Sequence, residues 1–215
     1  MVRLGGPSVK LARSGGRGHL GLSRQDAFSA GRGQTMASMA VVRSACSDDS
    51  RRLAEIHVSS WQRAYDGLLP PEFLHALSVE SRNEWWSRRL NALESGGAVL
   101  IVADSEEGAA EGFAFIGPCS ATHGEVYAIY VDPRRWRSGL GTQLLAAAER
   151  DLAAGGFGQA ILWVLEGNER GRLFYQTQGW RPDGALKIEE IGGVHVTELR
   201  YRKQIGGSGD QLRAS

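Results

Sequence analysis

The segment Asp132–Leu145 carries the residues whose types and spacing point most directly to chemistry. It reads DPRRWRSGLGTQLL, follows a run with the pattern of a strand and opens a run with the pattern of a helix. Gly139 and Gly141 lie at this junction, where a loop turns several backbone N–H groups and the positive end of a helix dipole toward one point. Such a point binds phosphate, so the sequence predicts a site for a phosphorylated ligand.

Two familiar phosphate-binding loops do not match this segment. A P-loop requires a lysine and then a serine or threonine after its last glycine, whereas Gly141 is followed by Thr142 and Gln143. A dinucleotide-binding loop requires three glycines on the first strand–helix turn. Here Leu144 stands at the third glycine position, and the segment comes late in the chain. The P-loop is therefore excluded and the dinucleotide loop is disfavoured.

A third class of loop fits both this segment and a second one downstream. Val131–Pro133 followed by WRSGLG resembles motif A of the GNAT superfamily of acyl-CoA N-acyltransferases. The segment NERGRLFYQTQGW (168–180) resembles motif B of the same superfamily. The resemblance covers Val41–Lys203, and WQRAYDGLLPPEFL (61–74) is similar to a subgroup of uncharacterised bacterial members. The coincidence of both motifs identifies the chain as a member of this superfamily.

The resemblance implies acetyl-CoA as a co-substrate and no metal. The pantetheine arm would lie between two strands that splay apart, paired with backbone near Ile129 and Val131 like an added strand. The pyrophosphate would lie on the loop amides from Arg137 to Thr142. The residues expected to bind acetyl-CoA are Ile129, Tyr130, Val131, Trp136, Arg137, Ser138, Gly139, Leu140, Gly141, Thr142, Asn168 and Gly171.

Two residues depart from the usual motifs. Trp136 stands where glutamine or arginine is usual, and Gly171 stands where alanine is usual. The loop binds pyrophosphate mainly through backbone N–H groups, so Trp136 is compatible with binding. Gly171 costs the helix about 1 kcal/mol relative to alanine, and we expect it to let the pantetheine arm approach closely.

Glu125 is the candidate general base. Acetyl transfer to an amine requires removal of a proton from an ammonium whose pKa is about 10.4 for a lysine-like group. Glu125 lies eleven residues before Trp136, the offset of the catalytic glutamate in the histone-acetylating branch of the superfamily. Strand alternation would place it on one face with Tyr127, Ile129 and Val131. The alternatives are a carboxylate that serves solubility at a strand end, and His123 as a rival base.

Tyr175 is the candidate general acid, which would protonate the departing thiolate of coenzyme A. It falls seven residues after Asn168, as motif B requires. The alternative is a core aromatic beside Phe174 and Trp180. Asn168 is expected both to cap the helix and to contact the pantetheine.

The sequence says less about the site of the amine acceptor than about the site of acetyl-CoA. Trp61, Tyr65, Trp85, Trp86 and His195 are candidates to line its site, although aromatic residues at helical spacing are more often core. The function expected is N-acetyltransfer to a primary amine of a small molecule or peptide, by direct attack in a ternary complex. Two alternative functions stay open. One is a protein lysine or N-terminal acetyltransferase, and the other is a non-catalytic CoA-binding sensor or scaffold.

The elements that position these residues follow from hydrophobic periodicity and turn signals. Strands are expected at 41–43, 98–103, 112–117, 125–131 and 159–165, and on both sides of Gly192–Gly193. Helices are expected after Ser47 or Asp48, at 72–77, at 78–94, from Leu140 to Gly155, and at 168–178. The fold class is α/β (α+β), a GNAT fold. It has a mixed, mostly antiparallel, twisted sheet of about six or seven strands, a central splayed parallel pair, and about four helices on both faces.

The composition is that of one globular domain, with 215 residues, 42% hydrophobic and 23% charged, and a net charge of +1. This charge balance does not favour binding to nucleic acid. A membrane-spanning helix needs about 20 apolar residues in a row, and no apolar run is that long. Two cysteines without histidines at ligand spacing predict no metal site and a reducing, cytoplasmic location. The expected partner is the amine acceptor, and a homodimer stays open.

The first 38 residues differ from the rest of the chain. They are basic, rich in glycine, serine and arginine, and carry one acid, Asp26, so we expect them to be disordered. A transit peptide is an alternative, but dense glycine disfavours its amphipathic helix. We interpret the segment as an upstream extension or a leader, with Met36 or Met39 as a natural start. The acetyltransferase domain is expected at 39–203 and a flexible tail at 204–215.

Overall fold

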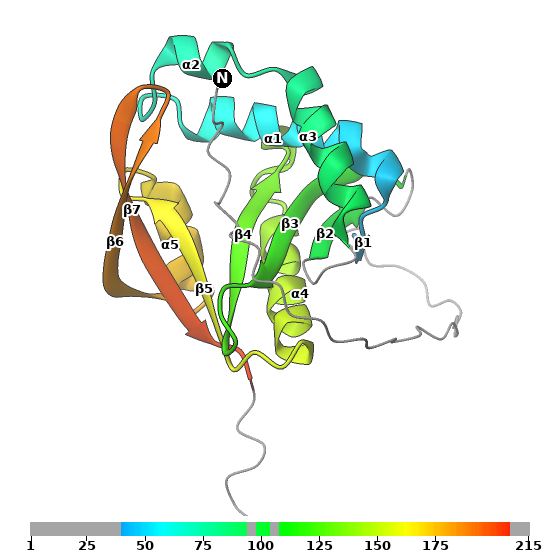
Figure 1. The fold of residues 1–215 in the computed structure, drawn as a ribbon, viewed down its shortest axis with the longest axis vertical. Coiled ribbons are helices and arrows are strands. Elements are labelled where there is room, and N and C mark those ends of the chain that lie inside the picture. Colours follow the sequence, from blue (N-terminus) through cyan, green and yellow to red (C-terminus); the bar gives the residue numbers. More distant parts are fainter. Residues whose placement is uncertain (1–39, 94–97, 104–107, 207–215) are drawn as a thin grey trace, which may run out of the picture.

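The computed structural model describes residues 40–93, 98–103 and 108–206. A seven-stranded sheet runs through the molecule in the order β1-β2-β3-β4-β5-β7-β6 (Figure 1). Only β4 and β5 pair in parallel, which confirms the mixed, mostly antiparallel sheet. The strands are β1 (Val41–Ser44), β2 (Ala98–Ala103), β3 (Ala110–Pro118), β4 (His123–Val131), β5 (Gln159–Leu165), β6 (Arg181–Ile191) and β7 (Val194–Gln204).

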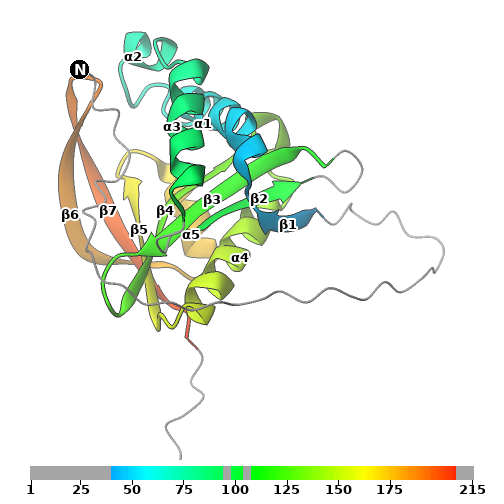
Figure 2. The same cartoon turned by 45° about the vertical axis from the view of Figure 1, so that its right-hand side comes forward.

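Five α-helices in this part of the chain cover both faces of the sheet, one for each helical range expected from the sequence. Helices α1 and α3 lie on one face, and α4 and α5 lie on the other (Figures 1 and 2). The helices are α1 (Ser50–Ala64), α2 (Pro71–His75), α3 (Val79–Asn91), α4 (Leu140–Ala154) and α5 (Glu169–Thr177). Each face of the sheet therefore has its own hydrophobic core.

The core under α4 includes Leu144, Leu162 and Trp180, each at most 1% exposed. The core under α1 and α3 includes Ile56 and Trp86, also at most 1% exposed. Burying such side chains contributes about 1.5–3 kcal/mol each. The two cores hold α1 and α4 on opposite sides of β4, the strand that carries most of the candidate site.

Side-chain caps set the starts of two helices as the sequence indicates. The Ser78 hydroxyl accepts a hydrogen bond from the Ser81 amide before α3, and Asn168 caps α5. The start of α1 differs from the prediction, because residues Ser47–Asp49 form a separate 3₁₀ turn. The Asp49 carboxylate is bound there by the Arg43 guanidinium and the Cys46 amide, each at 2.8 Å, so α1 begins at Ser50 rather than after Ser47 or Asp48.

Strands β4 and β5 separate part-way along their length, which confirms the expected splay. They pair only from His123–Gln159 to Val126–Leu162. Beyond this point β4 continues to Val131 and β5 continues to Leu165, and β5 pairs there with β7 alone. The two strands therefore leave unpaired backbone edges facing each other across a gap.

A β-bulge in β4 changes which of its side chains share a face. The β3–β4 register shifts between Phe115, which pairs with Ala128, and Ile116, which pairs with Val126. Tyr127 is the extra residue on β4. A bulge of this kind inserts one residue and breaks the strict alternation of side chains.

The prediction that Glu125, Tyr127, Ile129 and Val131 share one face is wrong for this reason. Ile129 and Val131 pack with Val126 against the core under α4, whereas Tyr127 packs against the core under α1 and α3. Glu125 precedes Val126 in the strand and so points to the opposite face. The bulge places Glu125 on the α1 and α3 side of the sheet.

The chain ends extend past the described part of the protein. The predicted extension at 1–38 and the end of the predicted tail from 207 onward lie outside the described residues, as does Glu94, at which α3 was expected to end. Helix α3 ends at Asn91, and β7 runs to Gln204. Within the described ranges, no helix combines the length and apolar character needed to cross a bilayer.

Candidate active site

A cavity of about 750 Å³ opens at the gap between β4 and β5. Its walls come from α1, α3, α5, the loop before α4 and the β6–β7 hairpin. The predicted residues that line it are Glu125, Ile129, Tyr130, Val131, Trp136, Arg137, Gly139, Gly141, Thr142, Asn168, Gly171 and Tyr175. Two predicted residues, Ser138 and Leu140, do not line the cavity. The Ser138 hydroxyl donates a hydrogen bond to the Arg135 carbonyl at 2.6 Å, and Leu140 lies in the core with 4% of its surface exposed.

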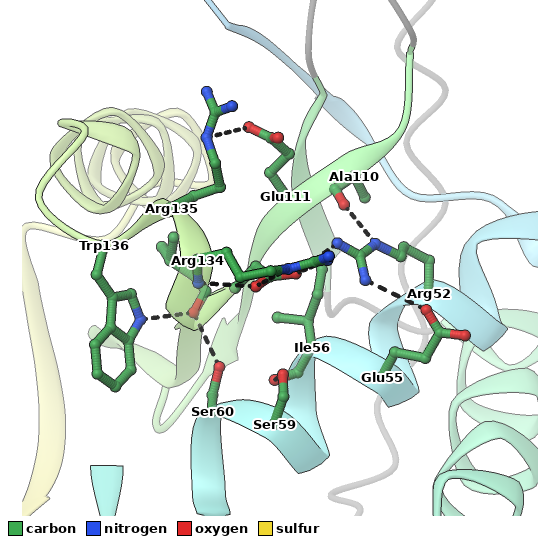
Figure 3. Close-up of polar contacts among 12 residues, drawn as sticks. Arg52, Glu55, Ile56, Ser59, Ser60, Ala110, Glu111, Arg134, Arg135 and Trp136 are labelled. Carbon is green, nitrogen blue, oxygen red and sulfur yellow. Dashed lines mark hydrogen bonds and ion pairs between the residues drawn. The ribbon is translucent and has the colours of Figure 1, made fainter. Parts of the chain in front are cut away.

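The loop between β4 and α4 is anchored by a buried carboxylate, Asp132. It accepts hydrogen bonds from the side chains of Arg52 and Arg134, each at 2.7 Å, and from the Arg134 amide at 3.0 Å (Figure 3). These bonds, those of Arg134 foremost, hold the pKa of Asp132 well below its usual range. Arg134 therefore neutralises Asp132, and Arg135 forms an ion pair with Glu111.

Trp136 ties the same loop back to β4. Its indole Nε1 donates to the Val131 carbonyl at 2.8 Å, and the Ser60 hydroxyl of α1 donates to the same oxygen at 3.0 Å (Figure 3). The guanidinium of Arg170 lies 3.4 Å from the centre of the Trp136 ring, a cation–π contact. Trp136 thus fixes both the loop and a cation of α5.

The loop then forms an anion-binding cradle. Arg137 and Gly139 adopt left-handed φ values of +66° and +87°, and such alternation turns successive amides to one side. The amides at 140–142 begin α4 and have no partner within the helix. No hydrogen bond in the described part of the chain uses the amides of 137–142. Six donors therefore remain free beside the cavity.

Cations surround this cradle. Arg63, Arg137 and Arg170 all line the cavity. Burial, and then the charges of Arg137 and Arg63, lower the pKa of Arg170, which places three positive groups close together. Among the described residues, no carboxylate forms an ion pair with Arg170. An arrangement of free amides and unneutralised guanidinium groups fits a pyrophosphate.

The gap between the strands presents backbone groups of β4. The Asp132 amide donates to the Glu111 carbonyl of β3 at 2.8 Å. Because backbone groups of successive residues alternate in direction along a strand, those of Val131 and Ile129 point toward β5. The Val131 carbonyl is taken by Trp136 and Ser60. The Val131 amide and both groups of Ile129 remain for an extended ligand.

Glu125 lies on the cavity wall with an altered acidity. Burial raises the pKa of its carboxyl above the ordinary value. The Cys119 thiol and the Lys187 ammonium lower this pKa, and the Glu198 carboxylate raises it. A half-buried carboxylate with a raised pKa is suited to accept a proton near neutral pH. The geometry is compatible with the role that the sequence predicts.

Tyr175 lines the cavity with a hydroxyl that has no hydrogen-bond partner among the described residues. Its ring packs 5.3 Å from Phe174 and 6.3 Å from Tyr201, centre to centre, so the core contact considered from the sequence is also present. Burial, and then the nearby Tyr130, raise the pKa of Tyr175 well above its ordinary value. The phenol therefore stays protonated at neutral pH.

Asn168 caps α5, and this cap explains an unusual glycine. The Asn168 side chain accepts from the Gly171 amide at 2.9 Å. A Cβ built on Gly171 would lie 2.7 Å from the amide nitrogen of the Asn168 side chain. Glycine at 171 therefore gives the cap room, a reason different from the close pantetheine approach that the sequence suggested.

Comparison with known proteins gives this site a family. A family model described as "Acetyltransferase (GNAT) family" matches residues 52–180. The chain belongs to the GNAT family. It is 34% identical to the uncharacterized N-acetyltransferase YuaI of Bacillus subtilis, over 75% of this chain and 91% of that protein.

Solved structures share the GNAT fold. The PaiA N-acetyltransferase of Thermoplasma acidophilum, in complex with coenzyme A, is similar with a TM-score of 0.60 and 21% identity. The match covers 77% of this chain and 98% of that one. YncA of Salmonella typhimurium, solved with acetyl-CoA, gives a TM-score of 0.59 and 18% identity. The match covers 82% of this chain and 100% of that one. The GNAT architecture expected from the motifs is confirmed.

The β6–β7 hairpin gives this GNAT protein site residues that sequence reasoning missed. Lys187 and Glu198 form a 2.7 Å ion pair on the cavity wall, and the Lys187 ammonium lies 4.8 Å from the centre of the Trp163 ring. A signal was available, because a two-residue turn at Gly192–Gly193 fixes the hairpin register and pairs 187 with 198.

Both candidate histidines lie outside the lining of the cavity. His123 is hydrogen-bonded to Gln159 and Thr122 at the paired end of β4 and β5. His195 is exposed on β7 opposite Glu190. The four candidate aromatics, Trp61, Tyr65, Trp85 and Trp86, do line the cavity. Within the described ranges, no group of three side chains is arranged to hold a metal ion.

Proposed function

We propose that this protein is an N-acetyltransferase that moves the acetyl group of acetyl-CoA to a primary amine of a small molecule or peptide. One observation carries the proposal: a cradle of free amides and cations, a strand gap and two titratable groups, Glu125 and Tyr175, all border a single cavity. The chemistry supplied by acetyl-CoA is a thioester that is open to attack by an amine.

The cradle at 137–142 would hold the pyrophosphate through its amides, with Arg63 and Arg170 adding charge. The pantetheine arm would pair with the backbone of Ile129 in the strand gap, like an added strand. The Val131 amide would then donate to the oxyanion that forms during attack. Since the Val131 carbonyl is already bound by Trp136, the amide of this peptide unit is held in position.

Glu125 would accept the proton from the acceptor ammonium, directly or through water, and so free the nucleophilic lone pair. Attack forms the C–N bond, and collapse of the tetrahedral species breaks the C–S bond. The second proton of the attacking nitrogen is then released and restores the Tyr175 phenol after that phenol has protonated the thiolate. Tyr175 would donate its proton to the departing thiolate, whose basicity resembles that of cysteine, about 8.5. A tyrosine with a raised pKa is protonated when the thiolate leaves.

Free thiols at Cys46 and Cys119 support a reducing, cytoplasmic setting.

The test is release of free thiol from acetyl-CoA in the presence of a panel of primary amines. Glu125→Gln and Tyr175→Phe keep the shapes of the side chains and are each expected to lower kcat by about 10²–10⁴-fold. Glu190→Gln, an exposed carboxylate on the same hairpin as Glu198, serves as the control. Tight binding of coenzyme A without turnover of any amine would refute catalysis and favour a CoA-binding sensor.

A further inference from the structure

One part of the cavity wall contains a buried cation that has no acidic partner among the described residues. Arg82, on α3, is 4% exposed and lines the cavity. Among the residues that the structure describes, its guanidinium makes no hydrogen bond and no ion pair. Its carbon lies 5.9 Å from the centre of the Trp85 ring. Burial lowers the pKa of Arg82, and the nearby Tyr130 opposes this shift.

Two further unpartnered polar groups line the same cavity. Both ring nitrogens of His57 and the indole nitrogen of Trp86 are buried and lack a hydrogen-bond partner within the described part of the chain. Burial, and then the charge of Arg82, hold the pKa of His57 well below its ordinary value. The neutral imidazole still offers one N–H donor. We call Arg82, His57 and Trp86 the donor cluster.

An unpaired guanidinium on a residue that is mostly buried is costly, because burial removes part of its hydration. The carboxylates on the cavity wall do not supply a partner: Glu189 and Glu198 both pair with Lys187. Among the described residues, Glu125 forms no ion pair with Arg82 either. An anion bound in the cavity would supply the counter-charge of Arg82. The planar fork of a guanidinium matches a carboxylate through two parallel hydrogen bonds.

We propose that the donor cluster binds a carboxylate of the acceptor, so that the preferred acceptors are primary amines that also carry a carboxylate, such as amino acids. The inference rests on the proposed function and names its substrate class. Glu125 faces the amine and Arg82 faces the carboxylate, so the cavity is complementary to a zwitterion. The phosphates of acetyl-CoA have separate cations at the cradle.

The experiment compares amino acids with the matching amines that lack the carboxylate, at saturating acetyl-CoA. Four proteins are measured: the wild type, Arg82→Met, Arg82→Lys and Arg88→Met. Met fills the volume without a charge, Lys keeps the charge without the fork, and Arg88 is an exposed arginine of the same helix. Because Arg82→Met removes an unpaired buried charge, it is expected to leave Tm unchanged or raised.

The wild type is expected to favour the carboxylate-bearing amine by at least tenfold in kcat/KM, mainly through KM. Arg82→Met should abolish this preference, Arg82→Lys should retain part of it, and Arg88→Met should retain all of it. The KM for acetyl-CoA should stay the same in all four proteins. Turnover of amines without a preference, or a preference that survives Arg82→Met, overturns the inference and leaves the proposed function standing.

A direct binding measurement separates the two proposals. The coenzyme A complex is titrated calorimetrically with the same amino acids, for the wild type and for Arg82→Met. If no amine is acetylated, the proposed function fails, but binding that depends on Arg82 still supports a carboxylate site. If the wild type binds none of the amino acids, the proposal of a carboxylate site is overturned.

Discussion

Trp136 links three parts of the cofactor cradle, and replacing it tests whether the cradle is pre-organised. Its indole N–H bonds the Val131 carbonyl at 2.8 Å, and its ring lies 3.4 Å under the Arg170 guanidinium. Trp136→Phe removes the donor and keeps a ring for Arg170. Trp136→Leu removes both interactions. The two variants thus separate the hydrogen bond from the cation–π contact.

The expected magnitudes follow from these two contacts. A hydrogen bond contributes about 1 kcal/mol net, and a partly exposed cation–π contact contributes about 0.5–1 kcal/mol. A loop that loses them must be ordered on binding, and this cost is subtracted from affinity. The KM for acetyl-CoA should rise by about fivefold in Trp136→Phe and by about 10- to 30-fold in Trp136→Leu. Calorimetry with coenzyme A should give the same ratios in Kd.

Ser60→Ala provides the matched control. The Ser60 hydroxyl donates to the same Val131 oxygen at 3.0 Å but belongs to α1 rather than to the loop. Its loss should lower the free energy of unfolding by about 1 kcal/mol and leave the KM for acetyl-CoA within about twofold of the wild type. If Trp136→Leu binds coenzyme A as the wild type does, or if Ser60→Ala weakens binding equally, the pre-organisation argument is wrong.

Three further predictions concern acidity and backbone strain. Lys187→Met removes a cation that lowers the pKa of Glu125 and frees the Glu198 carboxylate that raises it, so the acidic limb of kcat/KM should move to higher pH. Asp132→Asn should lower the free energy of unfolding by about 2 kcal/mol at pH 7 in urea titrations. Because the hydrogen bonds from Arg134 and Arg52 depress the folded pKa of Asp132, the difference should shrink as pH falls below about 4, where the unfolded carboxyl protonates. Gly139→Ala meets no neighbouring atom, so backbone strain at φ +87° alone should cost about 1 kcal/mol of stability.

Local features of this protein were readable in the sequence because they depend on short-range chemistry. The glycine at 139 supplies a left-handed φ, Asn168 caps the helix that follows it, and hydrophobic periodicity marks β5 and α4 at their observed places. The spacing of such residues also carries the two GNAT motifs. These features predicted the cradle, the parallel pair and the family.

Long-range contacts decided the rest. The bulge at Tyr127, which moves Glu125 to the opposite face from Ile129, arises from the register of β4 against β3, and no local signal marks it. Arg170 becomes a cradle cation only because α5 packs it on Trp136. Arg82 reads as an ordinary surface residue of a charged helix, yet the packing of α3 on α1 leaves it 4% exposed. Sequence determines which groups this chain possesses, and tertiary packing decides which of them lose water and face one another across the cavity.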